Sequence, residues 1–273
     1  MLTSAAPPRA LHRLIAWAGT AVFALSLAYF LFSYATTFGA VAPDGALAGP
    51  VTWNVVLFTV FAMHHSVFAR ERVRAWVTRW CPPELERSFY VWVASLLFIA
   101  VCALWQPVPG AAWNADGAAL WALRLLQATG VWLTLRSAAI LDVRELSGLA
   151  MRRPEGLRLP AQESVAQGSV ARGSVARGSV ARGSVDGGLQ ASVMEFKTRG
   201  PYGWVRHPIY TGWFLMVLAA SPMTMTRLVF AVVSCAYLVA AIPFEERSLR
   251  NVSSGGYDRY KAQVRWKLLP GVY

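Results

Sequence analysis

The stretch VRHPIY, residues 205–210, sets the fold of the C-terminal part of this chain. Its proline, Pro208, suits the first turn of a helix, because the N–H group that proline lacks would be unpaired there. An apolar run covers residues 208–222, and a second apolar run covers residues 227–244. Only residues 223–226 lie between them, and we expect a tight turn there. The stretch therefore predicts an antiparallel helical hairpin.

The hairpin is expected to bring polar residues from its two ends together. VRHPIY supplies Arg206, His207 and Tyr210, and FEERSL, at the end of the second run, supplies Glu245 and Glu246. Ionisable groups beside membrane-buried segments indicate a functional site. Paired carboxylates can bind an ammonium group, and arginine and histidine can bind a carboxylate. A zwitterionic amino acid moiety with a charged sulfonium suits this mixture. The alternative is that arginine and glutamate simply pair with each other.

The composition places the hairpin in a membrane protein. Of the 273 residues, 56% are hydrophobic and 15% are charged, which is too apolar for an ordinary soluble domain. Four more apolar segments precede the hairpin, at residues 14–34, 53–69, 89–106 and 119–141. Most segments approach the roughly 20 residues that cross a bilayer, although the run at 208–222 is short. The predicted fold class is all-α, a polytopic bundle of about six transmembrane helices. The first segment is too long for a typical signal peptide and is expected to be retained.

The charges of the connections predict the orientation of the bundle. Residues 35–52 and 107–118 contain no Lys or Arg, whereas residues 70–88, the loop after residue 141 and the C-terminal tail are basic. This alternation predicts that both termini and the polar site face the cytoplasm. The Ala-rich and Arg-rich composition favours a bacterial inner membrane. The same alternation accounts for the net charge of +12, so nucleic acid is not an expected partner.

Three regions follow from this pattern: a transmembrane region at 1–150 with four helices, a linker at 151–195, and a C-terminal hairpin and tail at 196–273. The linker contains GSVAR three times in succession, at residues 168–182. Glycine and serine in each repeat predict a flexible, disordered cytoplasmic chain. The alternative is a basic strap on anionic lipid. The three cysteines show no CxxC spacing, which does not indicate a disulfide framework or a cysteine zinc site.

The C-terminal sequence resembles a known family. RGPYGWVRHPIYTGWFL and FEERSLRNVSSGGYDRYKAQVRWKLLP, within residues 199–270, resemble the signature of membrane-embedded isoprenylcysteine carboxyl methyltransferases and phospholipid methyltransferases. Upstream, HHSVFAR, ERSFYVWVASL, DVRELSGL and ASPMTM look like the methanethiol S-methyltransferase branch and its nitrite-reductase-associated relatives. The resemblance implies S-adenosylmethionine as the methyl donor. It also implies a small thiol as the acceptor, converted from methanethiol to dimethyl sulfide.

The resemblance also implies a set of site residues. The expected cofactor-binding residues, besides the backbone of residues 200–204, are Tyr202, Val205, His207, Pro208, Tyr210, Glu245 and Glu246. Tyr257 and Tyr260 either close a lid over this site or pack the tail on the membrane surface. Acceptors that remain open are a prenylated-cysteine carboxylate and a phospholipid amine. A transporter or a non-catalytic accessory protein is the alternative of another class.

His64, His65 and Arg206 are the candidate catalytic residues. A thiolate, not a thiol, attacks the methyl group, so a base or a positive charge beside the acceptor would help. Adjacent residues on a helix point in different directions, so at most one of the two histidines is expected to face a shared pocket. The alternative is that both are interfacial histidines at a helix end. Their spacing is not a recognised zinc motif, and no metal is expected. Arg124 and Arg136 either snorkel or face the cofactor.

Overall fold

The computed structural model of the protein describes residues 10–68, 70–82, 85–141, 198, 200–253 and 255–273. Its α-helices are α1 (Ala10–Ala35), α2 (Ala48–Phe68), α3 (Glu71–Val77), α4 (Glu86–Leu104), α5 (Gly117–Ile140), α7 (Pro208–Leu218), α8 (Met225–Val252) and α9 (Gly256–Gln263). Two short 3-10 helices are η1 (Thr37–Gly39) and η4 (Gly200–Gly203), and the two strands are β1 (Ala111–Trp113) and β2 (Met223–Thr224). The predicted linker and its repeats lie outside the described residues.

Five of these helices, α1, α2, α4, α5 and α8, are long and apolar enough to cross a membrane. The prediction of a mostly helical membrane protein is therefore confirmed. The short apolar run at 208–222 forms α7, which has only 11 residues. At about 1.5 Å per residue this helix covers roughly half of a hydrocarbon layer, so it is not a full span by itself.

The outer surfaces of the long helices are apolar. α1 exposes Leu14, Trp17, Leu25 and Phe32, each by more than 60%. A helix that is hydrophobic all round is either buried in a protein core or faces lipid. Because these side chains are exposed on the outer surface, they are suited to contact with the lipid of a bilayer.

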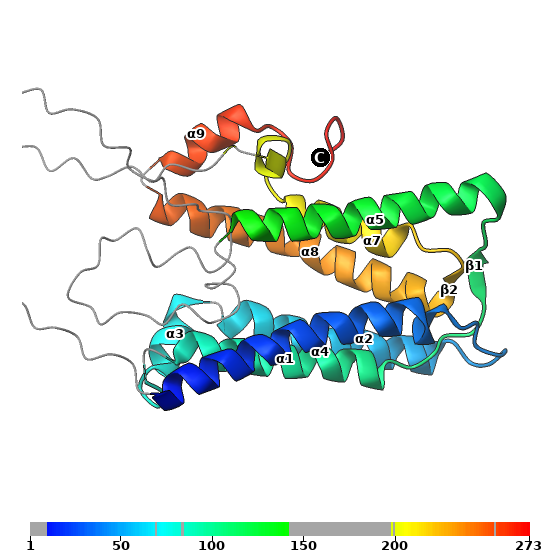
Figure 1. Ribbon diagram of the computed structural model, residues 1–273, viewed down its shortest axis with the longest axis horizontal. Helices are drawn as coiled ribbons and strands as arrows, with labels where there is room; N and C mark the ends of the chain where they lie inside the picture. Colours follow the sequence, from blue (N-terminus) through cyan, green and yellow to red (C-terminus); the bar gives the residue numbers. More distant parts are fainter. Residues whose placement is uncertain (1–9, 69, 83–84, 142–197, 199, 254) are drawn as a thin grey trace, which may run out of the picture.

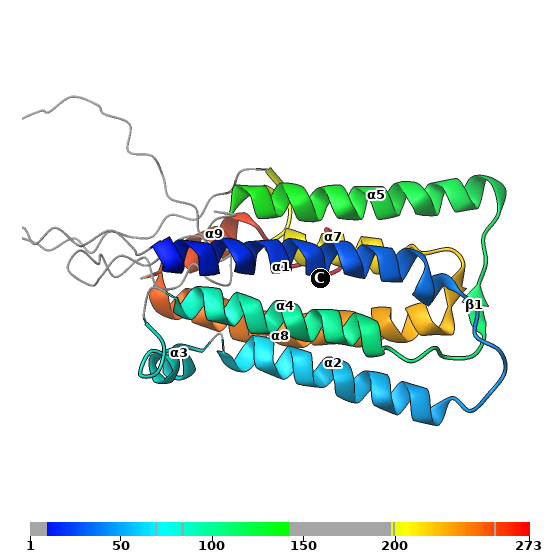
Figure 2. The same ribbon diagram turned by 60° about the horizontal axis from the view of Figure 1, so that its bottom comes forward.

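The helices form two groups, with α1, α2 and α4 on one side and α5, α7 and α8 on the other (Figure 1). After the turn, α1 and α4 of the first group lie in front of α7 and α8 of the second (Figure 2). Aromatic side chains from both groups make up the core between them. Phe30 of α1 stacks on Trp213 of α7 with ring centroids 4.9 Å apart and on Phe230 of α8 at 5.3 Å. Phe58 of α2 meets Phe230 edge-on at 5.8 Å. These rings fix α7 and α8 against the first group of helices.

α5 and α7 approach each other through glycine. A Cβ atom on Gly130 would lie 2.6 Å from the carbonyl oxygen of Gly212, and a Cβ atom on Gly212 would lie 2.6 Å from the carbonyl oxygen of Gly130. Small residues allow such backbone contact between helices in a membrane. The pair therefore sets the position of α7, and with it the residues at the start of that helix.

The predicted tight turn at residues 223–226 is wrong. Met223 and Thr224 instead form β2, which pairs antiparallel with β1. Met225 already begins α8, because the Thr224 side chain caps this helix by accepting a hydrogen bond from the Arg227 N–H at 3.1 Å. The strand pair lies at one end of the bundle (Figure 1). We call this end the β end.

Candidate functional site

The start of α7 lies beside the C-terminal part of α8 (Figure 1). His207 is the N-cap residue of α7, and Pro208 is the first helical residue, as its missing N–H favours. Glu245 and Glu246 lie about 30 Å along α8 from its first residue. That distance is close to the thickness of the hydrocarbon layer. The two glutamates therefore lie at the end of the bundle away from the β end.

Five side chains meet at this point, and we call them the polar cluster: Arg206, His207, Tyr210, Glu245 and Glu246. Arg206 Nε lies 2.9 Å from Glu246 Oε1, and the Tyr210 hydroxyl donates a hydrogen bond to Glu245 Oε2 at 2.8 Å. His207 lies between the carboxylates, with Nδ1 3.5 Å from Glu245 Oε2 and Nε2 3.4 Å from Glu246 Oε1. Its ring stacks on Tyr210. The hairpin thus brings these residues together, as its topology predicts.

The polar cluster is almost entirely buried. The side chains of Arg206 and His207 are 3% and 5% exposed, and those of Glu245 and Glu246 are each 10% exposed. The cluster contains two carboxyl groups, one guanidinium, one imidazole and one phenol. Charges are buried only when they are paired or have a function. Within the part of the chain that the structure describes, no group of three or more His, Cys, Asp or Glu side chains could hold a metal ion.

The C-terminal tail covers the cluster and is bound to it by hydrogen bonds. Arg206 Nη1 donates to the carbonyl oxygens of Val264 at 2.9 Å and Arg265 at 2.6 Å. The backbone N–H groups of residues 206 and 207 donate to the carbonyl oxygens of residues 266 and 267 at 2.9 Å. The Thr211 hydroxyl donates to the Leu268 carbonyl at 2.7 Å. The Arg206 side chain therefore donates its hydrogen bonds to Glu246 and to the tail.

Tyr257 and Tyr260 lie in a packed core under α9, with Leu249 and Val264. The Tyr260 hydroxyl donates to the carbonyl oxygen of Tyr202 at 2.9 Å. Burial raises the pKa of both hydroxyls, so both stay protonated at neutral pH. These contacts pack α9 against the end of α8 and against η4, and the lid and membrane-surface roles both stay predictions.

Tyr202 and Val205 are buried just before the cluster, each 3% exposed. Tyr202 lies in η4, whose first residue, Gly200, has a φ of +64°. A side chain at this position would be strained, so glycine permits the turn that leads to Val205 and Arg206. The segment therefore leads directly into the polar cluster, and its part in cofactor binding stays a prediction.

The two histidines of α2 have different surroundings. His65 Nδ1 lies 2.8 Å from the Tyr90 hydroxyl of α4, whereas His64 stacks on Phe68 of its own helix. His64 also stacks on Tyr90, with ring centroids 5.9 Å apart, so both histidines contact this tyrosine. Tyr90 was not among the predicted site residues, although it belongs to the stretch ERSFYVWVASL.

Arg124 lies far from the polar cluster, since its Nη2 donates to the carbonyl oxygen of Ser221 beyond the C-terminal end of α7. Of the two predicted alternatives, facing the cofactor site is therefore wrong for this residue. Arg136 is an exposed residue of α5.

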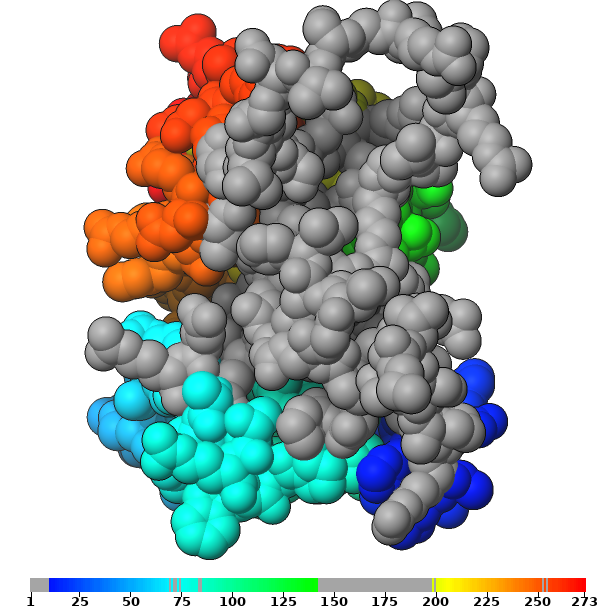
Figure 3. Space-filling view, turned by 90° about the vertical axis from the view of Figure 1, so that its left-hand side faces the viewer, coloured from blue at the N-terminus to red at the C-terminus, as the bar shows by residue number. Residues whose placement is uncertain are grey.

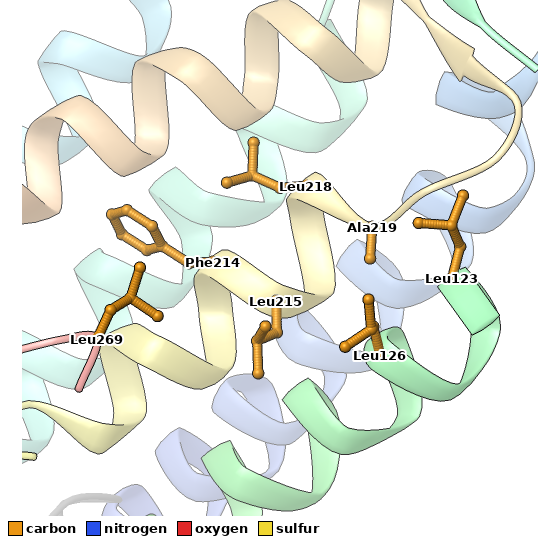
Figure 4. A pocket seen from close by; sticks show the side chains of 7 residues that line it. All are labelled: Leu123, Leu126, Phe214, Leu215, Leu218, Ala219 and Leu269. Atoms are coloured by element: carbon orange, nitrogen blue, oxygen red, sulfur yellow. The ribbon is translucent and has the colours of Figure 1, made fainter. Parts of the chain in front are cut away.

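An apolar groove of about 250 Å³ runs between α5 and α7 (Figure 4). It is lined by Leu123, Leu126, Phe214, Leu215, Leu218, Ala219 and Leu269. These side chains offer no hydrogen-bonding or ionisable group, so the groove cannot perform acid–base chemistry or bind a charged donor. Ionisable side chains gather instead in the polar cluster.

Comparisons with known proteins agree with this geometry. Residues 191–251 match the isoprenylcysteine carboxyl methyltransferase (ICMT) family, and this segment contains every member of the polar cluster. No solved structure matches the chain.

Relatives with a curated function cover most of the chain. A methanethiol S-methyltransferase of Mycobacterium tuberculosis is 33% identical over 236 residues, which are 83% of this chain and 82% of that protein. One from Crocosphaera subtropica is 32% identical over 77% of this chain and 71% of that protein. Nurim of Homo sapiens matches a shorter part, with 31% identity over 42% of this chain and 52% of that protein. The chain therefore belongs to the methanethiol S-methyltransferase family and is a methyltransferase.

Proposed function

We propose that this protein transfers a methyl group from S-adenosylmethionine to a small thiol, with methanethiol as the favoured acceptor and dimethyl sulfide as the product. The buried polar cluster between α7 and α8 is the observation that carries this proposal. The names of the relatives support the reaction and the acceptor.

The chemistry of the polar cluster fits a cationic donor. Its two carboxyl groups can accept hydrogen bonds from an ammonium group, and its guanidinium and imidazole can donate to a carboxylate. Glu245 accepts its one short side-chain hydrogen bond from Tyr210, which leaves lone pairs for an ammonium group. Glu246 is already engaged by Arg206. We therefore assign the ammonium contact to Glu245 and a positioning role to Glu246.

The other residues of the proposed cofactor site hold this arrangement in place. We assign His207 to the polar end of the donor, because its ring lies between both carboxylates. Pro208 fixes the first turn of α7, and Tyr202 and Val205 form the buried wall beside it. Arg206 links the cluster to the tail and is proposed as a positioning residue. The bound cofactor would supply a methyl group on a sulfonium, and the new sulfur–carbon bond to the acceptor would form as the sulfonium–methyl bond breaks.

The His65–Tyr90 pair is the proposed acceptor side of the site. The thiol must lose its proton to become the nucleophile. His65 can take this proton on the ring nitrogen that Tyr90 does not contact, while the 2.8 Å contact from Tyr90 fixes the orientation of the imidazole. His64, the preceding residue of α2, stays a candidate catalytic residue beside this base.

The proposed topology places both termini and the polar cluster at the cytoplasmic face, in a bacterial inner membrane. α3, α9 and the end of α8 lie at the same end of the bundle (Figures 1 and 3). This end carries many Lys and Arg residues, whereas the connections 36–47 and 105–116 at the β end have none.

Cysteine labelling tests the topology. An impermeant maleimide applied to intact cells should modify the variant Asp44→Cys, at the β end, and leave Asp258→Cys in α9 unmodified. The opposite labelling pattern would place the polar cluster outside the cytoplasm.

The function is tested with purified protein, labelled S-adenosylmethionine and methanethiol, by headspace gas chromatography for dimethyl sulfide. Glu245→Gln should lose product and cofactor binding together. Asp258→Asn is the matched control, because this carboxylate is exposed and its ion pair among the described residues is with the equally exposed Arg250. Binding without product in the unmodified protein would redirect the search to a prenylated-cysteine carboxylate or a phospholipid amine. Absence of both would contradict the proposal.

A further inference from the structure

A second cationic site lies at the β end, away from the polar cluster. It is a pocket of about 170 Å³ between α1 and α5, with α7 and α8 beneath. Arg124 and Arg227 both line it, together with Tyr34 and Gln127. No carboxylate is among the lining residues, all of which the structure describes. We call it the arginine pocket.

Arg227 is fixed in this pocket by backbone carbonyls. Its Nε and Nη2 donate to the carbonyl oxygens of Tyr34 and Ala35 at the end of α1, at 2.7–2.9 Å, and its Nη1 donates to that of Pro222 at 2.6 Å. The residue is only 3% exposed. Carbonyl dipoles hold the guanidinium in place but do not cancel its full charge. It is thus a preorganised positive centre.

Arg124 is the more accessible partner. It donates to Gln127 Oε1 and to the Ser221 carbonyl oxygen, both at 3.1 Å. A guanidinium has five N–H donors. Three donors of Arg124 thus have no partner among the described residues, and this arginine lies about 10 Å along α5 from the start of the helix. An arginine within an apolar helix points to a functional partner.

The lining becomes apolar in one direction. From the arginines toward the middle of the bundle, the pocket is bounded by Leu31 of α1 and Val131 of α5. One helical turn further on the same faces lie Leu27 and Leu135, which are 39% and 63% exposed. A ligand with a charged head and an apolar tail parallel to the helices matches this order of polar and apolar groups.

We propose that the arginine pocket binds the phosphodiester headgroup of an anionic phospholipid, with an acyl chain lying along the seam between α1 and α5. Arginine donates paired hydrogen bonds to phosphate oxygens through the planar guanidinium. The volume is below the roughly 300 Å³ at which sites for whole small molecules begin, so it suits a headgroup phosphate. Two cations with no carboxylate favour a lipid with net negative charge over a zwitterionic one.

Native mass spectrometry of the detergent-purified protein tests this proposal. Phosphatidylglycerol, phosphatidylcholine and glycerol phosphate are each titrated in, so that charge and acyl chains are varied separately. We expect one retained phosphatidylglycerol and weaker retention of the other two. Arg124→Gln should weaken phosphatidylglycerol binding about tenfold or more, because hydrogen bonds to a charged group are lost. Arg124→Lys, which keeps the charge but not the planar fork, should give a smaller loss.

Arg136→Gln is the matched control, since it removes an exposed arginine from the same helix outside the pocket. It should bind phosphatidylglycerol as the unmodified protein does. Equal binding by Arg124→Gln and unmodified protein would overturn the proposal, as would an equal loss in Arg136→Gln. If glycerol phosphate bound as tightly as the lipid, the pocket would be a site for a free phosphate, and the lipid assignment would be wrong. Methyl transfer is not part of the readout, so this test is independent of the proposed reaction.

Discussion

Arg206 joins α7, α8 and the C-terminal tail through one buried guanidinium. Breaking a buried pair on one side costs about 3–5 kcal/mol, because a charge is left without a partner. Arg206→Lys cannot donate hydrogen bonds to Glu246 and to the two tail carbonyl oxygens at once, because an ammonium group lacks the planar set of donors of a guanidinium. We expect this variant to melt at a lower temperature in detergent and to be cleaved faster by protease in the tail.

Arg250 provides the control for this prediction, because its pair with Asp258 is exposed, with side chains 47% and 55% accessible. Exposed pairs contribute about 0–1 kcal/mol. Arg250→Lys should therefore leave the melting temperature and the cleavage rate near those of the unmodified protein. Equal effects of the two substitutions would mean that Arg206 does not hold the tail.

Tyr90 is predicted to act on the reaction through His65. Tyr90→Phe removes the hydroxyl that lies 2.8 Å from His65 Nδ1 and changes little else in shape. We expect kcat to fall about tenfold or more, since the base would lose its orientation. The KM for S-adenosylmethionine should stay the same. Tyr29→Phe, on the partly exposed outer face of α1, is the control. An unchanged kcat, or a change in KM alone, would remove Tyr90 from the proposed acceptor side.

The polar cluster could be predicted from the sequence because its members lie at the two ends of one hairpin, where local order along the chain fixes their proximity. Tyr90 could not be found this way. Its contact with His65 spans 25 residues and depends on how α2 and α4 pack. The tail contacts of Arg206 depend likewise on a return of the chain about 60 residues later.

At the scale of elements, the contact of α5 with α7 depends on two glycines. A methyl group on Gly130 would lie 2.6 Å from the Gly212 carbonyl oxygen and 2.7 Å from the Met216 nitrogen, both of which belong to the backbone. Overpacking of this kind costs about 1–3 kcal/mol. We expect Gly130→Ala to lower the melting temperature and, because α7 must shift, to weaken binding of S-adenosylmethionine.

Gly49→Ala is the matched control, because nothing lies within 4 Å of a Cβ atom at that helical position. It should leave both measurements unchanged. Tolerance of Gly130→Ala with normal cofactor binding would show that the position of α7 does not depend on this contact.

The long helices could be predicted from the sequence and the short elements could not. Hydropathy predicts a run such as 119–141 to within a few residues of α5, because a membrane span needs many apolar residues in succession. α3 and α9 have seven and eight residues with mixed polarity, which leaves no such run. β1 and β2 pair two segments more than 100 residues apart, so no local pattern indicates them.

The whole molecule combines a buried polar cluster, which is the proposed donor site, with apolar outer surfaces. The polar cluster lies about 30 Å from the start of α8, and thus near one boundary of the hydrocarbon layer. A charged donor can reach it from water, whereas an apolar thiol can arrive through the bilayer. This division of access supports a small volatile acceptor and explains why the enzyme is built into a membrane.

The GSVAR repeats are predicted to be dispensable at this scale. They lie between α5 and η4, outside the segment with the polar cluster. If residues 151–195 act as a linker, removing residues 168–182 changes the loop-closure free energy by only about 0.3 kcal/mol, because that cost grows with the logarithm of loop length. Turnover should stay within about twofold of the unmodified protein.

A second variant separates length from charge. Replacing Arg172, Arg177 and Arg182 with serine keeps the length and removes the basic groups that could bind anionic lipid. Turnover is measured in vesicles that contain phosphatidylglycerol, together with the melting temperature of each variant. The linker interpretation requires normal turnover from both variants. Loss of turnover in both, with unchanged melting temperatures, would favour the basic strap. Loss in the deletion alone would mean that the distance spanned by these residues is needed for α5 and η4 to reach their positions.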